Sequence, residues 1–119
     1  MLVKLLKSKL HCAKITDTKL HYMGSMAVDS ELMEAAGLVP YELVLVADLD
    51  NGSRLETYVV PEEAGSRRVE ILGAAAKLME KGHTVIVMGF GLFEPKEAKT
   101  YKPRVVVLDE NNNIVKKTP

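Results

Sequence analysis

Gly24-Ser25 is a dipeptide at which this chain could carry out chemistry on its own backbone. The serine hydroxyl can attack the preceding carbonyl and shift the acyl group from nitrogen to oxygen, and glycine leaves room for that attack because it has no Cβ. The resulting ester can eliminate to dehydroalanine, which hydrolyses to a pyruvoyl group. Gly-Ser also occurs at Gly52-Ser53 and Gly65-Ser66, and a turn is the simpler explanation of each of the three dipeptides. The dipeptide alone therefore does not decide between self-processing and a turn.

Other chemical motifs are weaker. The sequence has no Gly-x-x-x-x-Gly-Lys-Ser/Thr phosphate loop and no Cys-x-x-Cys. His11, Cys12, His21 and His83 could be imagined as a zinc set, but their spacing matches no zinc-ligand pattern. We interpret them as partly buried or surface histidines and a core cysteine, and we expect no metal.

Composition narrows the class of protein. The chain has 119 residues, enough for one domain, and 16 Lys+Arg against 16 Asp+Glu, so its formal net charge is zero. This balance disfavours bulk nucleic acid and anionic membranes as partners, and four Tyr and two Phe give little support to a nucleic-acid-binding barrel. No apolar run is long enough to cross a membrane, and the first nine residues lack the pattern of a secretory signal. The single cysteine fits a reducing compartment, so we expect a cytoplasmic protein.

Short strands separated by turns must position any site. Alternating and apolar runs predict strands, and glycines, prolines and capping residues mark the ends of short helices. The predicted strands cover residues 3–20, 42–48, 54–60, 69–72, 84–90 and 104–108, and the predicted helices cover residues 30–36, 73–81 and a turn at 94–99, before a frayed tail at 116–119. These elements favour a compact, mainly β-barrel with helical inserts.

A set of short motifs resembles a known family in order and spacing. The set consists of Lys9-Leu10-His11, Leu20 to Ser25, Arg54 with Thr57-Tyr58, Gly65-Ser66-Arg67, and Gly73-Ala74-Ala75-Ala76. Together these motifs resemble the pyruvoyl-dependent aspartate 1-decarboxylases from about Met1 to about Pro103. The resemblance implies one domain over residues 1–119 with the fold of a six-stranded double-psi β-barrel and short helices. It also implies a homotetramer with sites between neighbouring subunits.

The same resemblance implies an activity and roles for individual residues. The family decarboxylates L-aspartate to β-alanine and CO₂ for pantothenate and coenzyme A synthesis, through a Schiff base with a pyruvoyl group and without metal or pyridoxal phosphate. Cleavage would separate residues 1–24, the β chain, from residues 25–119, the α chain. The resemblance implies that Gly24 and Ser25 form the cleavage site, that Ser25 becomes the pyruvoyl group, and that Thr57 acts in processing and substrate binding. It implies that Tyr58 is the proton donor and that His11 and Tyr22 line the pocket. The further substrate contacts that it implies are Lys9, Arg54 and the backbone of Gly73, Ala74 and Ala75.

One position departs from the family pattern. Family members typically have Asn immediately before Gly-Ala-Ala-Ala, where this chain has Leu72, which offers no side-chain hydrogen bond. Another group could substitute, processing or turnover could be altered, or the substrate preference could have shifted. The alternative to an active enzyme is an unprocessed, silent or altered-specificity barrel that binds a small acid or a protein partner. The sequence leaves open whether cleavage is spontaneous or assisted by a maturation factor.

Overall fold

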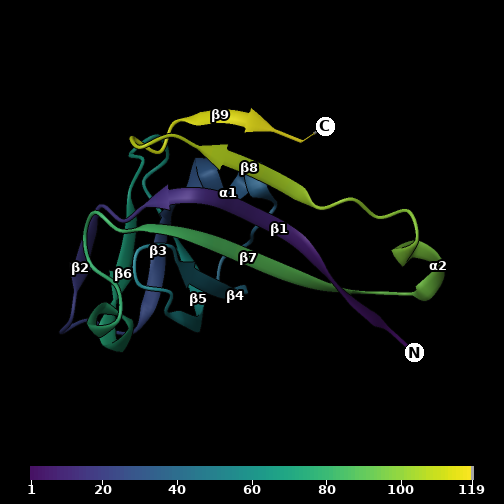
Figure 1. Ribbon diagram of the computed structural model, residues 1–119, viewed down its shortest axis with the longest axis horizontal. Helices are drawn as coiled ribbons and strands as arrows, with labels where there is room; N and C mark the ends of the chain where they lie inside the picture. The colour runs from purple at the N-terminus through teal and green to yellow at the C-terminus, as the bar shows by residue number, and fades with distance from the viewer. Residues whose placement is uncertain (119) are drawn as a thin grey trace.

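Nine strands form one hydrogen-bonded sheet in the computed structural model, which describes residues 1–118 (Figure 1). Their order across the sheet is β2-β6-β3-β5-β4-β7-β1-β8-β9. The strands are β1 (Val3–Lys14), β2 (Asp17–Lys19), β3 (Ser25–Asp29), β4 (Leu43–Asp48), β5 (Arg54–Glu62), β6 (Val69–Leu72), β7 (Thr84–Phe93), β8 (Arg104–Leu108) and β9 (Ile114–Lys117). The predicted mainly β fold is confirmed, and its assignment to the six-stranded double-psi type stays a prediction.

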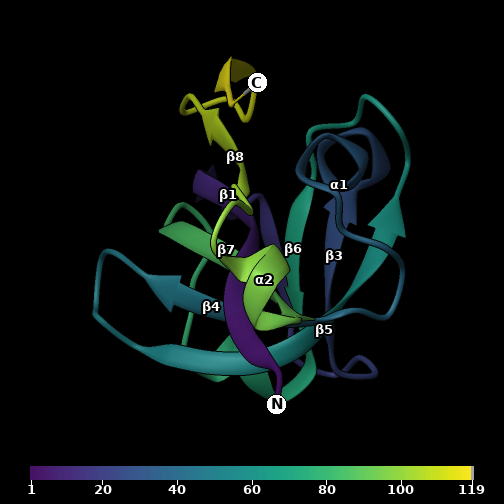
Figure 2. The ribbon, with the colours of Figure 1, turned by 90° about the vertical axis from the view of Figure 1, so that its right-hand side faces the viewer.

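The sheet curves around its core at β5, because the two halves of this long strand pair with different strands. Its first half runs antiparallel to β4, and its second half runs parallel to β3. In the end-on view of Figure 2, β5 curves from β4 on one side of the molecule to β3 on the other. The buried faces of the strands supply an apolar core that includes Leu10, Val28, Val46, Val59, Ile71 and Val87.

β1 and β7 are the longest pair and run side by side along the molecule (Figure 1). β8 pairs with the other edge of β1 in parallel. The strands predicted over residues 42–48 and 54–60 are present as β4 and β5, and they form a hairpin with Gly52 in the left-handed region at φ 76°. These pairings place β1, β7, β4 and β5 next to one another in the sheet, and the site described below uses their two faces.

The first helix forms where its capping residues predict it. Helix α1 (Ser30–Ala36) begins after Asp29, whose side chain accepts a hydrogen bond from the Glu31 amide, and it ends at Gly37, which has φ 74°. Helix α2 (Pro95–Ala98) lies within the predicted turn at 94–99. None of the helices in residues 1–118 combines the length and apolar character needed to span a lipid bilayer.

Several predicted elements differ from the structure. No strand was predicted where β3 (Ser25–Asp29) lies, and β7 runs to Phe93, beyond the predicted residues 84–90. The helix expected over residues 73–81 is a 3₁₀ helix, η1 (Gly73–Lys77), which ends four residues earlier. Asn51 reaches across from the β4–β5 turn and donates to the Leu78 carbonyl at 2.8 Å, so the backbone after η1 is held by a tertiary contact and not by a further helical turn. The predicted frayed tail instead contributes Lys116 and Lys117 to β9, which pairs with β8. Pro119 lies outside the described residues.

Candidate active site

Ser25 is the first residue of β3 and lies against a cavity of about 320 Å³. Its relative exposure is 5%, whereas the preceding Gly24 is exposed. Ser25 pairs with Leu72 across the β3–β6 ladder, which fixes its backbone beside the start of η1. The cavity is lined by Gly24, Ser25, Leu55, Glu56, Thr57, Leu72, Ala74, Ala75 and Leu78. The structure therefore brings Gly24, Ser25, Thr57, Ala74 and Ala75, five of the sequence-predicted site residues, to one cavity.

Gly73 is packed against the Gly24 backbone so closely that no side chain fits. A Cβ built on Gly73 would lie 2.7 Å from the Gly24 Cα and 3.0 Å from the Tyr22 carbonyl oxygen. Gly73 also has φ 74°, a conformation that costs other residues strain. Because it has no side chain, Gly73, the first residue of η1, can pack directly against the backbone beside the Gly24-Ser25 peptide.

Arg54 and Tyr58 lie on the opposite face of β5 from Thr57. Side chains alternate along a strand, so residues 54, 56 and 58 share one face and residues 55, 57 and 59 share the other. Burial agrees, because Arg54 and Tyr58 are exposed, Thr57 is half-buried and Val59 is fully buried. The predicted proton donor and the predicted carboxylate-binding arginine thus face away from this chain's own Ser25 cavity.

Lys9 shares that outer face with Arg54 and Tyr58. It pairs with Met88 of β7, Met88 pairs with Leu45 of β4, and Leu45 pairs with Glu56 of β5. Directly opposed residues in antiparallel strands project to the same side of a sheet, so this row carries Lys9 to the face of Glu56. The neighbours of Lys9 along β1, Ser8 and Leu10, are fully buried on the other side.

Neither Lys9 nor Arg54 has a carboxylate partner within 4.0 Å among the described residues. Lys7, Arg67 and Arg68, by contrast, all form ion pairs. A cation without an internal partner on an outer face is free to bind an anion that arrives from outside the chain. Both side chains are therefore available to bind anions.

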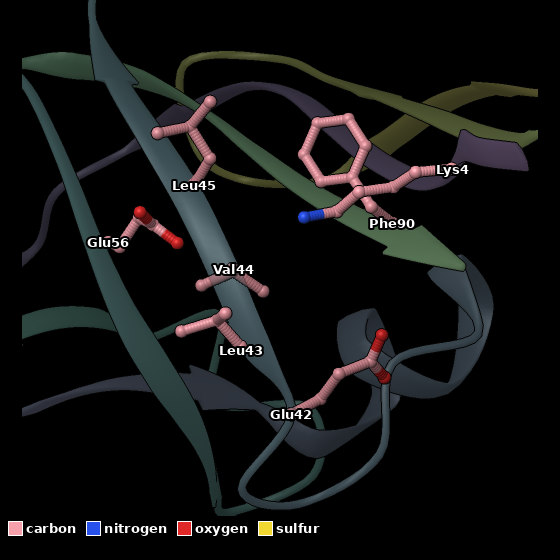
Figure 3. A pocket seen from close by; sticks show the side chains of 7 residues that line it. All are labelled: Lys4, Glu42, Leu43, Val44, Leu45, Glu56 and Phe90. Carbon is pink, nitrogen blue, oxygen red and sulfur yellow. The ribbon is translucent and has the colours of Figure 1, made fainter. Parts of the chain in front are cut away.

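A second, larger pocket of about 470 Å³ opens on this outer face. Figure 3 shows the Lys4 amine and the Glu56 carboxylate pointing into it from opposite sides, over a floor of Val44 and Leu45. The remaining lining residues are Glu42, Leu43 and Phe90. Leu43 and Phe90 are exposed hydrophobic side chains, so the outer face combines apolar surface with isolated charges.

Two predicted pocket residues do not line the Ser25 cavity. Tyr22 is 59% exposed, with the Lys19 ammonium 5.3 Å from its ring centroid. His11 is half-buried in β1, and its Nδ1 is the only buried side-chain nitrogen or oxygen of residues 1–118 that has no hydrogen-bond partner. Leu72 is 6% exposed and forms part of the cavity wall, where it contributes only hydrocarbon.

The four residues considered as a zinc set do not form a cluster among the described residues. Cys12 lies at a β-bulge with φ 66°, and Ala13, not Cys12, takes the buried position that follows Leu10. The predicted core cysteine is therefore half-buried. His83 joins Asp48 in a separate hydrogen-bonded group.

Sequence reasoning missed three lining residues of the Ser25 cavity. Leu55 could have been found from its spacing, because it lies two residues before Thr57 on the same face of the strand. Glu56 lines both the Ser25 cavity and the outer pocket. Leu78, the residue directly after η1, also lines the Ser25 cavity. No sequence signal marks Leu78, since its position depends on where η1 ends.

Comparisons with known proteins give a consistent result. A family model described as aspartate decarboxylase matches residues 1–115. The aspartate 1-decarboxylase of Thermosipho africanus is 53% identical over 111 residues, which cover 93% of this chain and 91% of that protein. The aspartate 1-decarboxylase of Salinibacter ruber is 48% identical over 114 residues, which cover 96% of this chain and 78% of that protein. The chain, with its buried Ser25 beside Gly24, belongs to the aspartate decarboxylase family.

Proposed function

We propose that this protein decarboxylates L-aspartate to β-alanine and CO₂, and so supplies β-alanine for pantothenate synthesis. The observation that carries the proposal is the cavity that joins Gly24, Ser25 and Thr57 to the backbone of Ala74 and Ala75. Membership of the family supports the same activity, because the relatives that match are named for it.

Self-cleavage at Ser25 is the first chemical step of the proposal. The Ser25 Oγ attacks the Gly24 carbonyl carbon, its proton passes to the Ser25 nitrogen, and the peptide bond is replaced by an ester. Loss of the Ser25 α-proton then expels the Gly24 carboxylate and leaves dehydroalanine, which takes up water and releases ammonia to become a pyruvoyl group. Residues 1–24 and 25–119 are the products. Thr57, which lines the same cavity, is suited to hydrogen-bond the oxyanion at Gly24.

The residues present fit a pyruvoyl group at position 25, because Ser25 lines a cavity of about 320 Å³ and Gly73, which has no side chain, packs against the adjoining Gly24 backbone. Such a group would supply an electrophilic carbonyl that reacts with the substrate amine and accepts the electron pair left when CO₂ departs. Lys9 and Arg54 would hold the two substrate carboxylates, and Tyr58 would deliver the proton to Cα. Leu55, Leu72 and Leu78 would keep water from the reacting atoms.

The site is proposed to lie between subunits of a homotetramer. Ser25 and Thr57 face one cavity, whereas Lys9, Arg54 and Tyr58 face the outer side of the sheet. One chain alone therefore does not present its cations to its own Ser25. A neighbour that docks with its outer face over the cavity would complete the constellation, and the exposed Leu43 and Phe90 would be covered in the process.

Intact-mass measurement on the purified protein tests the proposal. Wild type should separate into two fragments after Gly24, with one water gained and one ammonia lost in the conversion, and it should release CO₂ from L-aspartate. Ser25→Ala should stay intact and inactive, while Ser66→Ala, which changes another Gly-Ser dipeptide, should be cleaved like wild type. Incubation with and without a cell extract separates spontaneous from assisted cleavage. An intact wild-type chain that never releases CO₂ in either condition would overturn the proposal and favour an unprocessed barrel.

A further inference from the structure

Hydrogen bonds join the turn directly before Arg54 to the segment that follows η1 and begins at the Ser25 cavity; we call this contact the tie. The turn connects β4 to β5, and the segment runs from Leu78 at the cavity to Thr84 at the start of β7. Asn51 donates to the Leu78 carbonyl at 2.8 Å, the Thr84 amide donates to the Asp50 carboxylate at 2.7 Å, and the Leu49 amide donates to the Thr84 carbonyl at 2.9 Å. Two parts of the proposed site therefore meet through this contact.

Asp48 and His83 lie at the centre of the tie. The Asp48 side chain is fully buried, and its Oδ2 lies 2.7 Å from the His83 Nδ1. Its Oδ1 accepts the Asp50 amide at 2.8 Å, which shapes the turn from within. The His83 Nε2 lies 3.4 Å from the Glu80 carboxylate. One carboxylate thus joins the last residue of β4, the turn and the segment before β7.

The charges around His83 favour the imidazolium form. The hydrogen bond to Asp48 raises the pKa of His83 above its ordinary 6.5 against the opposing effect of partial burial, and the charges of Asp48, Asp50 and Glu80 act in the same direction as that bond. From β1, Lys14 faces this region and donates to the Thr84 hydroxyl. An imidazolium can donate from both nitrogens, to Asp48 and to Glu80, whereas a neutral ring donates from only one. The tie should therefore weaken as the pH rises through the His83 pKa.

A metal ion explains this group less well than hydrogen bonding does. Ligand atoms of Asp48, Asp50 and His83 lie within 4.8 Å of one another. However, both Asp48 oxygens, one Asp50 oxygen and the His83 Nδ1 already have protein partners at 2.7–2.8 Å. The group is therefore satisfied as it stands.

We propose that Asp48 and His83 are positioning residues for the decarboxylation: their hydrogen bond fixes the β4–β5 turn, and through it the point from which Arg54 extends toward substrate. The inference rests on the proposed function, in which Arg54 binds a carboxylate. Because Arg54 would contact the substrate and not the cleavage site, loss of the tie should raise KM for aspartate more than it lowers kcat. Cleavage at Gly24 should continue.

Steady-state kinetics across pH test this role. His83→Gln keeps a donor and loses the charge, and His21→Gln, an exposed histidine outside the group, is the matched control. Wild type and His21→Gln should show a KM that rises from about pH 6 to about pH 8.5 as the imidazolium is lost. His83→Gln should have a KM about three- to tenfold above wild type at the lower pH, nearly independent of pH, with kcat within about twofold. A His83→Gln enzyme with the wild-type KM at every pH would overturn the inference.

Amide exchange separates this inference from the proposed function. The Asp50 and Thr84 amides, which both bind carboxylates of the group, should be protected in wild type and exchange about tenfold faster in His83→Gln at the same global stability. Equal protection in the two proteins would overturn the tie whatever the activity. If wild type released no CO₂ from aspartate, the proposed function would fall, and with it the kinetic role of the pair.

Discussion

Gly73 packs against the backbone at which the proposed cleavage would occur. Its turn touches the Gly24 Cα and the Tyr22 carbonyl at distances that leave no room for a methyl group. The contact is made by backbone on both sides, so neither partner can rotate away as a side chain would. We infer that it holds the scissile peptide in one conformation.

Gly73→Ala should therefore slow cleavage more than strain alone explains. Gly52→Ala is the matched control, because Gly52 has a nearly identical φ of 76° but nothing within 4 Å of its Cβ position. In both variants an alanine in the left-handed region should destabilise the local backbone by about 1–2 kcal/mol. Only Gly73→Ala displaces the Gly24 backbone, and we expect its cleavage rate to fall by about tenfold or more. Mass spectrometry over time measures the rate, and equal rates in the two variants would contradict a supporting role for Gly73.

The family resemblance implied which residues meet at Ser25, but not which of the implied site residues lie apart. Thr57 and Ala74 do line the cavity with Gly24-Ser25. Strand alternation could have predicted that Thr57 lies on the opposite face from Arg54 and Tyr58, because side chains an odd number of residues apart along a strand point to opposite faces. The tie between Asp48 and His83 could not be predicted in this way, since it joins the end of β4 to the segment before β7, 35 residues later.

At the scale of elements, local signals were sufficient where caps and turns act on neighbours in sequence. The α1 helix and the β4–β5 hairpin are of this kind. The missed strand β9 depends on backbone pairing with β8, and its exposed Lys116 and Lys117 carry no apolar signal. Directly after η1, the Leu78 carbonyl accepts a hydrogen bond from Asn51, which is far away along the chain. Strand β3, which was also not predicted, likewise depends on pairing with strands far along the chain, β5 and β6.

The junction of α1 with the loop before β6 depends on a single buried carboxylate. Asp29 accepts hydrogen bonds from the amides of Glu31, Gly65 and Arg67 at 2.8–3.0 Å. Burial alone would raise the pKa of Asp29, but these three amides and the Arg67 charge outweigh it and hold the pKa below its ordinary 3.8. The ionised carboxylate therefore stabilises the folded state.

Asp29→Ala should lower the free energy of unfolding by about 2–3 kcal/mol at neutral pH, because it removes a helix cap and leaves buried amides without acceptors. A group whose folded pKa is lowered contributes stability above its unfolded pKa and loses it as the pH falls through the folded value. The gap between wild type and Asp29→Ala should thus narrow below about pH 4. Urea unfolding at several pH values measures this, with exposed Glu63→Ala as the control. A gap that does not change with pH would argue against an ionic contribution.

At the scale of the whole molecule, the chain divides the proposed site between two surfaces. Ser25 and Thr57 belong to the cavity near β3 and η1, and Lys9 and Arg54 belong to the outer face formed by β1, β7, β4 and β5. Alternation along β5 places Thr57 and Arg54 on opposite faces of the sheet, and β5 itself curves from β4 to β3 (Figure 2). Assembly would therefore be a requirement for catalysis and not only a source of stability.

Mixed assemblies provide the test of this division. Ser25→Ala cannot form the reactive group but keeps Arg54, while Arg54→Ala keeps Ser25 and lacks the cation, so each should be inactive alone. When the two are co-expressed and assemble at random, a site that takes Ser25 from one subunit and Arg54 from its neighbour is intact in about a quarter of cases. We therefore expect about a quarter of wild-type CO₂ release from L-aspartate, with a mixed assembly of both variants visible by native mass spectrometry. Mixed assemblies without activity would mean that each chain uses its own Arg54, and the outer face would then need another role.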